Sequence, residues 1–214
     1  MFRKLILGFV LSLLIVILPA LLLRPDAIAC SKLWVMVGIG VLASITQPAY
    51  NPIDRDAPPE DRGTATQLVW TVYITLILGT IESLLWRYPR SMVWDTFSVS
   101  MLGVSVAGAL LRAWAVAELG NYFSWHVRVQ PEQSVIRTGP YRLVRHPGYT
   151  GAWILYVCCL LFIHAWIASA LCGVFLLVGF LRRIRYEEEL LLNSFGDHYR
   201  SYRQEVKQLI PLLW

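Results

Sequence analysis

Long apolar runs separated by short polar segments dominate the chain and predict a bundle of membrane-spanning helices. Each of the first four runs approaches or exceeds the roughly 20 apolar residues that an α-helix needs to cross a bilayer. These runs are Met1–Leu23, Leu33–Ala49, Thr64–Trp86 and Trp94–Ala117. A signal peptide is the alternative for the first run. That run is long for a signal core, however, and the charged segment Arg24–Asp26 follows it, so the pattern favours a retained helix.

A fifth apolar stretch, Tyr149–Phe180, is longer than the first four. It is too long for one comfortable span and short for two full ones, so it predicts a helical hairpin with one or both arms short or tilted. We expect the turn of this hairpin near residues 164–169. Arg182–Gln208 follows as a charged amphipathic helix, and Pro211 precedes an apolar tail.

The composition agrees with a membrane protein. Of the 214 residues, 57% are hydrophobic and 15% are charged, whereas about a quarter of a soluble domain is charged. The predicted fold is all-α and polytopic, with four N-terminal transmembrane helices, a membrane helical hairpin and a C-terminal cytosolic amphipathic helix. We divide it into the transmembrane residues 1–117 and residues 118–214, which hold most of the polar groups.

The basic residues gather beside the apolar runs, at positions 3–4, 128–145 and 182–207. The positive-inside rule places such clusters in the cytosol, so we expect the N-terminus and both C-terminal polar stretches there. The net charge of +5 is not spread in a basic stripe interleaved with aromatic residues, which argues against nucleic-acid binding. The four cysteines have no metal-ligand spacing, and we predict no metal site.

The polar loop 51–63 is rich in turn-forming residues and predicts a solvated connector. Its charged members are Asp54, Arg55, Asp56, Glu60, Asp61 and Arg62. Either Thr64 or Thr66 is a plausible N-cap for the helix that follows.

The first stretch with candidate chemistry is Arg145–Tyr149, with the sequence RHPGY. Pro147 disfavours helix at His146 and favours a helix start directly after it. The unpaired N–H groups of that start would face the cytosol, where an anionic group of a ligand can dock between His146 and Tyr149. The alternative is a simple interfacial helix start, with Arg145 at a lipid phosphate.

The second stretch places Arg183 and Glu187 four residues apart, hence on one helix face. Three consecutive acids, Glu187–Glu189, at the membrane boundary are costly unless they are paired or bind a cation. Arg183 and Glu187 are therefore candidate site residues, with Glu188 beside them. The alternative is a solvated helix face, which we expect for Arg185 and Glu189, paired with each other.

Together these stretches resemble the isoprenylcysteine carboxyl methyltransferase family and its relatives among phospholipid N-methyltransferases. The resemblance covers about the last ninety residues. It rests on Thr138-Gly139-Pro140-Tyr141, Arg145-His146-Pro147-Gly148-Tyr149, Gly151, an apolar hairpin, Glu187-Glu188, Phe195-Gly196, Tyr199 and Tyr202.

The resemblance implies S-adenosylmethionine as methyl donor, bound at the cytosolic end of the hairpin. It makes residues 118–214 the methyltransferase core and assigns six residues to the cofactor: Gly139, Tyr141, His146, Pro147, Tyr149 and Glu188. The family's arginine and glutamate near the methyl-accepting group fall on Arg183 and Glu187, which are the catalytic candidates.

The implied acceptor is a lipophilic, prenylcysteine-like carboxylate that enters sideways from the bilayer. Such a carboxylate is already ionised at pH 7 and needs no general base. A phospholipid amine or a small thiol is the alternative acceptor, for which Glu187 or His146 would serve as base. An NADPH-dependent membrane reductase and a non-catalytic membrane protein are further alternatives.

Overall fold

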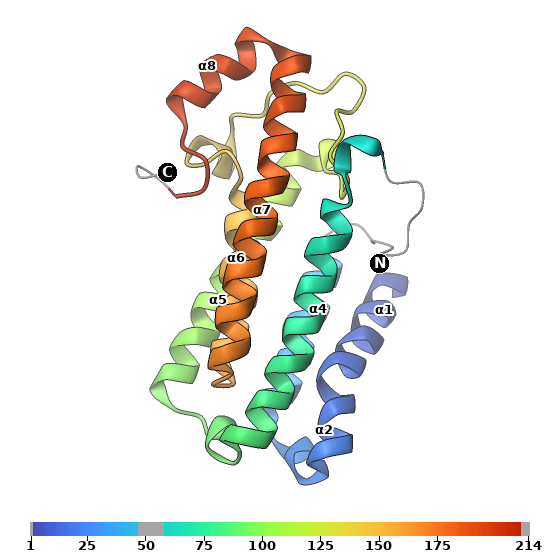
Figure 1. Cartoon of the computed structure of the whole chain (residues 1–214), viewed down its shortest axis with the longest axis vertical. Coiled ribbons are helices and arrows are strands. Elements are labelled where there is room, and N and C mark those ends of the chain that lie inside the picture. The colour runs from blue at the N-terminus through green and yellow to red at the C-terminus, as the bar shows by residue number, and fades with distance from the viewer. Residues whose placement is uncertain (1, 47–57, 211–214) are drawn as a thin grey trace.

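The computed structural model describes residues 2–46 and 58–210, with side chains from residue 5 onward. Over these residues the chain is a bundle of helices without a β-strand (Figure 1). The α-helices are α1 (Phe2–Ser12), α2 (Leu18–Leu23), α3 (Ser31–Ile45), α4 (Thr64–Glu82), α5 (Thr96–Leu119), α6 (Pro147–Phe162), α7 (Trp166–Phe195) and α8 (Asp197–Glu205).

Shorter helical turns complete these elements. The π-helical turns are η1 (Leu13–Ile17), which joins α1 to α2, and η4 (Ser83–Arg87), which extends α4. The 3₁₀ turns are η2 (Pro25–Ala29), η3 (Pro59–Asp61), η5 (Arg90–Met92), η6 (Gly120–Tyr122) and η7 (Gly139–Arg142). The turn η7 begins with Gly139 and Pro140 of the Thr138–Tyr141 motif.

The predicted all-α membrane fold is confirmed. Within the described residues, four helices are long and apolar enough to cross a membrane: Leu5–Leu23, Thr64–Arg87, Thr96–Tyr122 and Trp166–Phe195. The helices α3 and α6 are apolar but shorter, so the second predicted span and the first hairpin arm fall below full length. The hairpin turn, at residues 163–165, lies at the beginning of the predicted interval.

The C-terminal helix differs from its prediction. The charged residues from Arg182 onward do not begin a new helix, because α7 runs without interruption from Trp166 to Phe195. The break comes at Gly196, whose φ of +53° is a conformation that favours glycine. The separate amphipathic helix is therefore the short α8, and α7 extends past the bundle toward it (Figure 1).

Helices α5 and α6 cross in direct backbone contact. A Cβ on Gly108 would lie 2.8 Å from the Gly151 carbonyl oxygen, and a Cβ on Gly151 would lie 2.7 Å from the backbone nitrogen of Arg112. Small residues at the crossing thus allow the two backbones to pack closely. This crossing fixes the start of α6 against the end of α5.

Two charged side chains are buried at the end of the bundle opposite α8. Glu82 accepts hydrogen bonds from the Ile167 and Ala168 N–H groups and thereby caps α7. Lys32, which sequence reasoning did not single out, is fully buried and donates to the Phe162 carbonyl and the Ser98 hydroxyl.

The chain after α8 returns to the start of α6. Val144 and Lys207 form a parallel bridge, and the Lys207 carbonyl accepts from the Arg145 N–H at 2.8 Å. The Tyr202 hydroxyl donates to the Tyr141 carbonyl at 2.7 Å. These contacts hold α8, η7 and the beginning of α6 together as one polar end of the molecule.

Candidate active site

A cavity of about 460 Å³ extends from this polar end into the helix bundle. Helices α1, α3 and α4 give it apolar walls, with residues such as Leu11, Met36 and Val72. The start of α6, the polar half of α7 and the connector 122–136 give it arginine, glutamate, histidine and tyrosine side chains. One continuous cavity therefore has a polar part and an apolar part. Its walls come from residues before and after position 117, and the division of the chain at that position stays a prediction.

Arg183, Tyr149 and Glu187 meet at the polar part of the cavity. The Arg183 Nε donates to the Tyr149 hydroxyl at 2.7 Å, and that hydroxyl donates to Glu187 Oε2 at 2.6 Å. Arg183 is buried, while the side chain of Glu187 keeps 32% of its surface exposed. The two catalytic candidates are therefore connected through a predicted cofactor residue.

Behind Arg183 lies Asp61, which we expected in a solvated connector. That expectation is wrong for Asp61, which has no exposed surface and pairs with Arg183 at 2.9 Å. Its neighbours Glu60 and Arg62 are exposed as predicted, and Asp54–Asp56 lie outside the described residues. Asp61 Oδ2 also accepts from the Ala65 N–H, so the first turn of α4 is capped by this aspartate rather than by Thr64 or Thr66.

The electrostatics of Asp61 favour its charged form. Burial alone would raise the pKa of the Asp61 carboxyl, but the Arg183 guanidinium, the Ala65 and Val127 N–H groups and His126 together hold it below its ordinary 3.8. Asp61 is therefore ionised at neutral pH despite its burial.

Aromatic rings stack beside this group. The His146 ring lies parallel to that of Tyr149, with centroids 5.5 Å apart and planes 9° apart, and Tyr149 stacks on Phe180 at 5.0 Å. All three rings line the cavity. The stack gives this part of the cavity an aromatic wall beside the Glu187 carboxylate.

Glu188 lies in a cluster of cationic side chains. It accepts from Arg145 Nε at 2.8 Å, approaches Arg203 Nε at 3.3 Å and meets His146 Nε2 at 3.2 Å. It is buried and is not among the residues that line the cavity. The structure therefore places it behind His146, where it fixes α6 and α8 relative to α7, and its assignment to the cofactor stays a prediction.

The remaining predicted residues lie at different distances from the cavity. Tyr141 lines it and donates to the Ala115 carbonyl at 3.3 Å. Pro147 is the first residue of α6, as expected, but does not line the cavity. Gly139 adopts a φ of +54°, and a Cβ there would lie 2.5 Å from the Glu118 carboxylate, so its contact is with α5.

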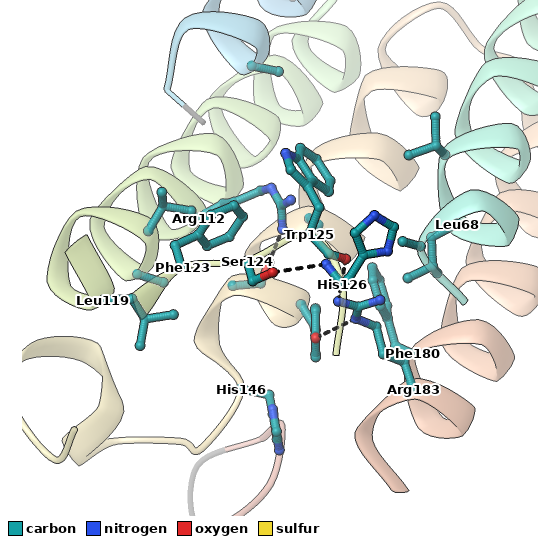
Figure 2. Close-up of a pocket in the computed structure, with 18 of the residues that line it drawn as sticks. Leu68, Arg112, Leu119, Phe123, Ser124, Trp125, His126, His146, Phe180 and Arg183 are labelled. Atoms are coloured by element: carbon teal, nitrogen blue, oxygen red, sulfur yellow. Dashed lines mark hydrogen bonds between the residues drawn. The ribbon is translucent and has the colours of Figure 1, made fainter. Parts of the chain in front are cut away.

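Arg112 and Trp125 also line the cavity, and the sequence analysis did not single them out. Arg112 lies inside an apolar run and donates to the Gly148 carbonyl at 3.0 Å, with its guanidinium 5.6 Å from the centre of the Trp125 ring. Trp125 offers its backbone carbonyl to Arg183 Nη2 at 2.6 Å. Figure 2 shows the side chains of Arg112 and Trp125 on one side of the pocket and Arg183 on the other. The signal that could have indicated Arg112 is a lone charge within an otherwise apolar span.

The phenols at this end remain neutral. Burial raises the pKa of Tyr141, of Tyr199 and of Tyr202 above its ordinary value of 10, and the Glu187 and Glu188 charges act in the same direction on these groups. At neutral pH the three hydroxyls therefore keep their protons and do not act as bases.

Residues 101–193 match the sequence model of the isoprenylcysteine carboxyl methyltransferase (ICMT) family. The protein-S-isoprenylcysteine O-methyltransferase of Schizosaccharomyces pombe is 29% identical over 178 residues, covering 71% of this chain and 75% of the relative. The human enzyme of that name is 30% identical over 142 residues, covering 63% of this chain and 47% of the relative.

The fold also has a solved counterpart. The structure of a eukaryotic intramembrane Ras methyltransferase, ICMT, superposes with a TM-score of 0.61 at 21% sequence identity, covering 94% of this chain and 73% of that one. The match agrees with the apolar helices of the bundle in indicating an integral membrane protein. The resemblance that the motifs indicated is thus confirmed, and the chain is an integral membrane protein that is similar in sequence and in fold to isoprenylcysteine carboxyl methyltransferases.

Proposed function

We propose that this protein transfers a methyl group from S-adenosylmethionine to the carboxylate of a lipophilic, prenylcysteine-like acceptor. The observation that carries the proposal is the single cavity that joins the group of Arg183, Tyr149 and Glu187 to apolar walls from α1, α3 and α4. A donor with a charged, polar body fits the polar part. An acceptor with a hydrocarbon tail fits the apolar part, and the two meet where the wall changes in character.

The residues present suit S-adenosylmethionine. When bound, this cofactor supplies an electrophilic methyl group on a sulfonium cation. The partly exposed Glu187 carboxylate and the stacked rings of His146 and Tyr149 are groups that attract such a cation. The neutral phenols of Tyr141 and Tyr202 add hydrogen-bonding capacity on the same wall.

The guanidinium groups suit an anionic acceptor. Arg183 and Arg112 both line the cavity, and their positive charges draw a carboxylate to the boundary between its two parts. A cationic amine would be repelled there. The acceptor carboxylate needs no base, so the protein's contribution is to hold it in line with the methyl group and to exclude water from both.

We infer that the cavity opens toward the cytosol and that the acceptor arrives from within the bilayer. The exposed Arg200 and Arg203 belong to α8, at one end of the molecule (Figure 1). The exposed Arg142 belongs to η7, which the Tyr202–Tyr141 hydrogen bond joins to α8. Basic residues at this end agree with the positive-inside rule. A prenylated protein with its lipid in the membrane would present its terminal carboxylate at that level.

Calorimetric titration of S-adenosylmethionine into the purified protein tests the cofactor, with NADPH as comparison. We expect saturable binding of the former, weakened about tenfold by Glu187→Gln because a charge-assisted contact is lost. Glu189→Gln is the matched control, since Glu189 is exposed on the other side of α7 from the cavity lining. Binding of NADPH alone would contradict the proposal.

Methyl transfer from labelled cofactor to an N-acetyl-S-prenylcysteine tests the acceptor. We expect product with this carboxylate and none with phosphatidylethanolamine vesicles. Methylation of the amine lipid in preference to the carboxylate would contradict the assignment of the acceptor while retaining that of the cofactor.

A further inference from the structure

Asp61 connects parts of the chain that are far apart in sequence. It lies at the end of η3, directly before α4, and is fully buried. Its Oδ1 accepts from Arg183 Nη1 at 2.9 Å and from the Val127 N–H at 3.1 Å. The carboxylate thereby touches α4, α7 and the connector after α5.

The partners of Arg183 show what this contact does. Arg183 Nη1 also donates to the Thr64 hydroxyl at 3.0 Å, Nη2 donates to the Trp125 carbonyl, and Nε donates to the Tyr149 hydroxyl. All three guanidinium nitrogens are thus held. The planar guanidinium has a fixed fork of donors, so fixing Nη1 and Nη2 also fixes the direction of Nε.

The direction of Nε in turn determines a contact at the cavity wall. Nε points to Tyr149, whose hydroxyl in turn donates to Glu187. Asp61, Arg183, Tyr149 and Glu187 therefore form a continuous chain of hydrogen bonds from a fully buried carboxylate to a partly exposed one. Asp61 does not line the cavity, so it acts through Arg183.

We propose that Asp61 is a positioning residue for the methyl transfer, because it fixes the guanidinium that orients Tyr149 and Glu187 at the cavity. The inference rests on the proposed function. It assigns to the segment before α4 a part in the reaction that neither the family match, which begins at residue 101, nor the sequence motifs include.

The test is a double-mutant cycle on the full chain with a prenylcysteine acceptor. Asp61→Asn keeps the shape of the side chain and removes its charge. We expect kcat to fall on the order of 10- to 100-fold, as small misplacements of catalytic groups do, while the Kd for S-adenosylmethionine stays within about twofold by calorimetry. In an Arg183→Lys background, adding Asp61→Asn should lower kcat by less than a further factor of about two, because Asp61 acts through the guanidinium that this background lacks.

Asp95→Asn is the matched control. Asp95 caps the first turn of α5 through the Ser98 N–H, as Asp61 caps α4, but it lies away from the cavity. We expect its kcat to equal that of the wild type. Should Asp61→Asn fail to fold, Thr64→Val is the second variant, since it removes the hydroxyl that contacts both Asp61 and Arg183. We expect Thr64→Val to lower kcat several-fold in the wild-type background and to have no further effect in the Arg183→Lys background.

The outcomes separate the two proposals. Independent, multiplying effects of Asp61→Asn and Arg183→Lys would show that Asp61 is only structural, and so would an equal fall of kcat in Asp95→Asn. A wild type that turns over and an Asp61→Asn variant that matches it would overturn the role of Asp61 alone. A wild type that binds the cofactor but methylates no carboxylate would overturn the proposed function and, with it, this role.

Discussion

At the scale of single residues, Tyr149 joins two charged groups through one hydroxyl. The hydroxyl accepts from Arg183 and donates to Glu187, while the ring stacks between His146 and Phe180. The two parts of the side chain therefore have separable roles. The ring shapes the wall of the cavity, and the hydroxyl sets the geometry of the polar group.

The Tyr149→Phe variant separates these roles. It keeps the stacked ring and removes the link between Arg183 and Glu187, so we expect kcat to fall on the order of 10-fold or more with little change in cofactor affinity. Steady-state kinetics and calorimetry check this. Tyr186→Phe, which removes a hydroxyl bonded to exposed Arg182 on the same helix as Arg183, should leave kcat unaffected. A large loss of cofactor affinity in Tyr149→Phe would contradict the separation.

At the scale of elements, the crossing of α5 and α6 positions the site. Gly108 and Gly151 bring the two backbones together, and this places Arg112 beside the first turn of α6. The site thus depends on a contact between two apolar helices that carry few polar groups themselves.

A methyl group at this crossing should be disruptive. In Gly151→Ala the new Cβ would lie 2.7 Å from backbone atoms of α5, and overpacking of this kind costs about 1–3 kcal/mol. We expect a lower thermal midpoint and a lower kcat, because Arg112 shifts with α5. Gly103→Ala is the control, since a Cβ there has no neighbour within 4 Å. Equal thermal midpoints for Gly151→Ala and Gly103→Ala would show that α5 and α6 can move apart without loss of stability.

The sequence predicted the elements better than the contacts between them. Pro147 and the four-residue spacing of Arg183 and Glu187 act through their near neighbours, so local rules placed the start of α6 and the polar face of α7. Asp61 was misread because its partner is 122 positions away. A charged residue in a polar loop is usually solvated, and nothing in the loop itself indicates burial against a distant helix.

At the scale of the whole molecule, the two ends of the bundle differ in character. One end holds α8 (Figure 1), and the exposed Arg200 and Arg203 of that helix and the polar part of the cavity lie there. At the other end, Lys32 and Glu82 are buried against the helix termini at the hairpin turn. The proposed orientation places the first end in the cytosol.

Cysteine labelling tests this orientation. In a background without the four native cysteines, Arg200→Cys and Arg90→Cys introduce exposed thiols at opposite ends of the bundle. We expect a membrane-impermeant maleimide to label position 90 in intact cells and position 200 only after permeabilisation. The reverse pattern would invert the topology and place the site outside the cytosol.

The uninterrupted length of α7 sets the depth of the chemistry. From Trp166 to Arg183 the helix rises about 26 Å, at about 1.5 Å per residue, which is close to the roughly 30 Å thickness of a hydrocarbon core. Arg183 and Glu187 would then lie at the level of the lipid headgroups, where a carboxylate is hydrated before it reacts. Methylation removes that charge, so the ester formed would prefer a deeper position than its precursor. Departure of the product into the bilayer would thus be favoured by the reaction itself, and turnover would vary with the thickness of the surrounding membrane.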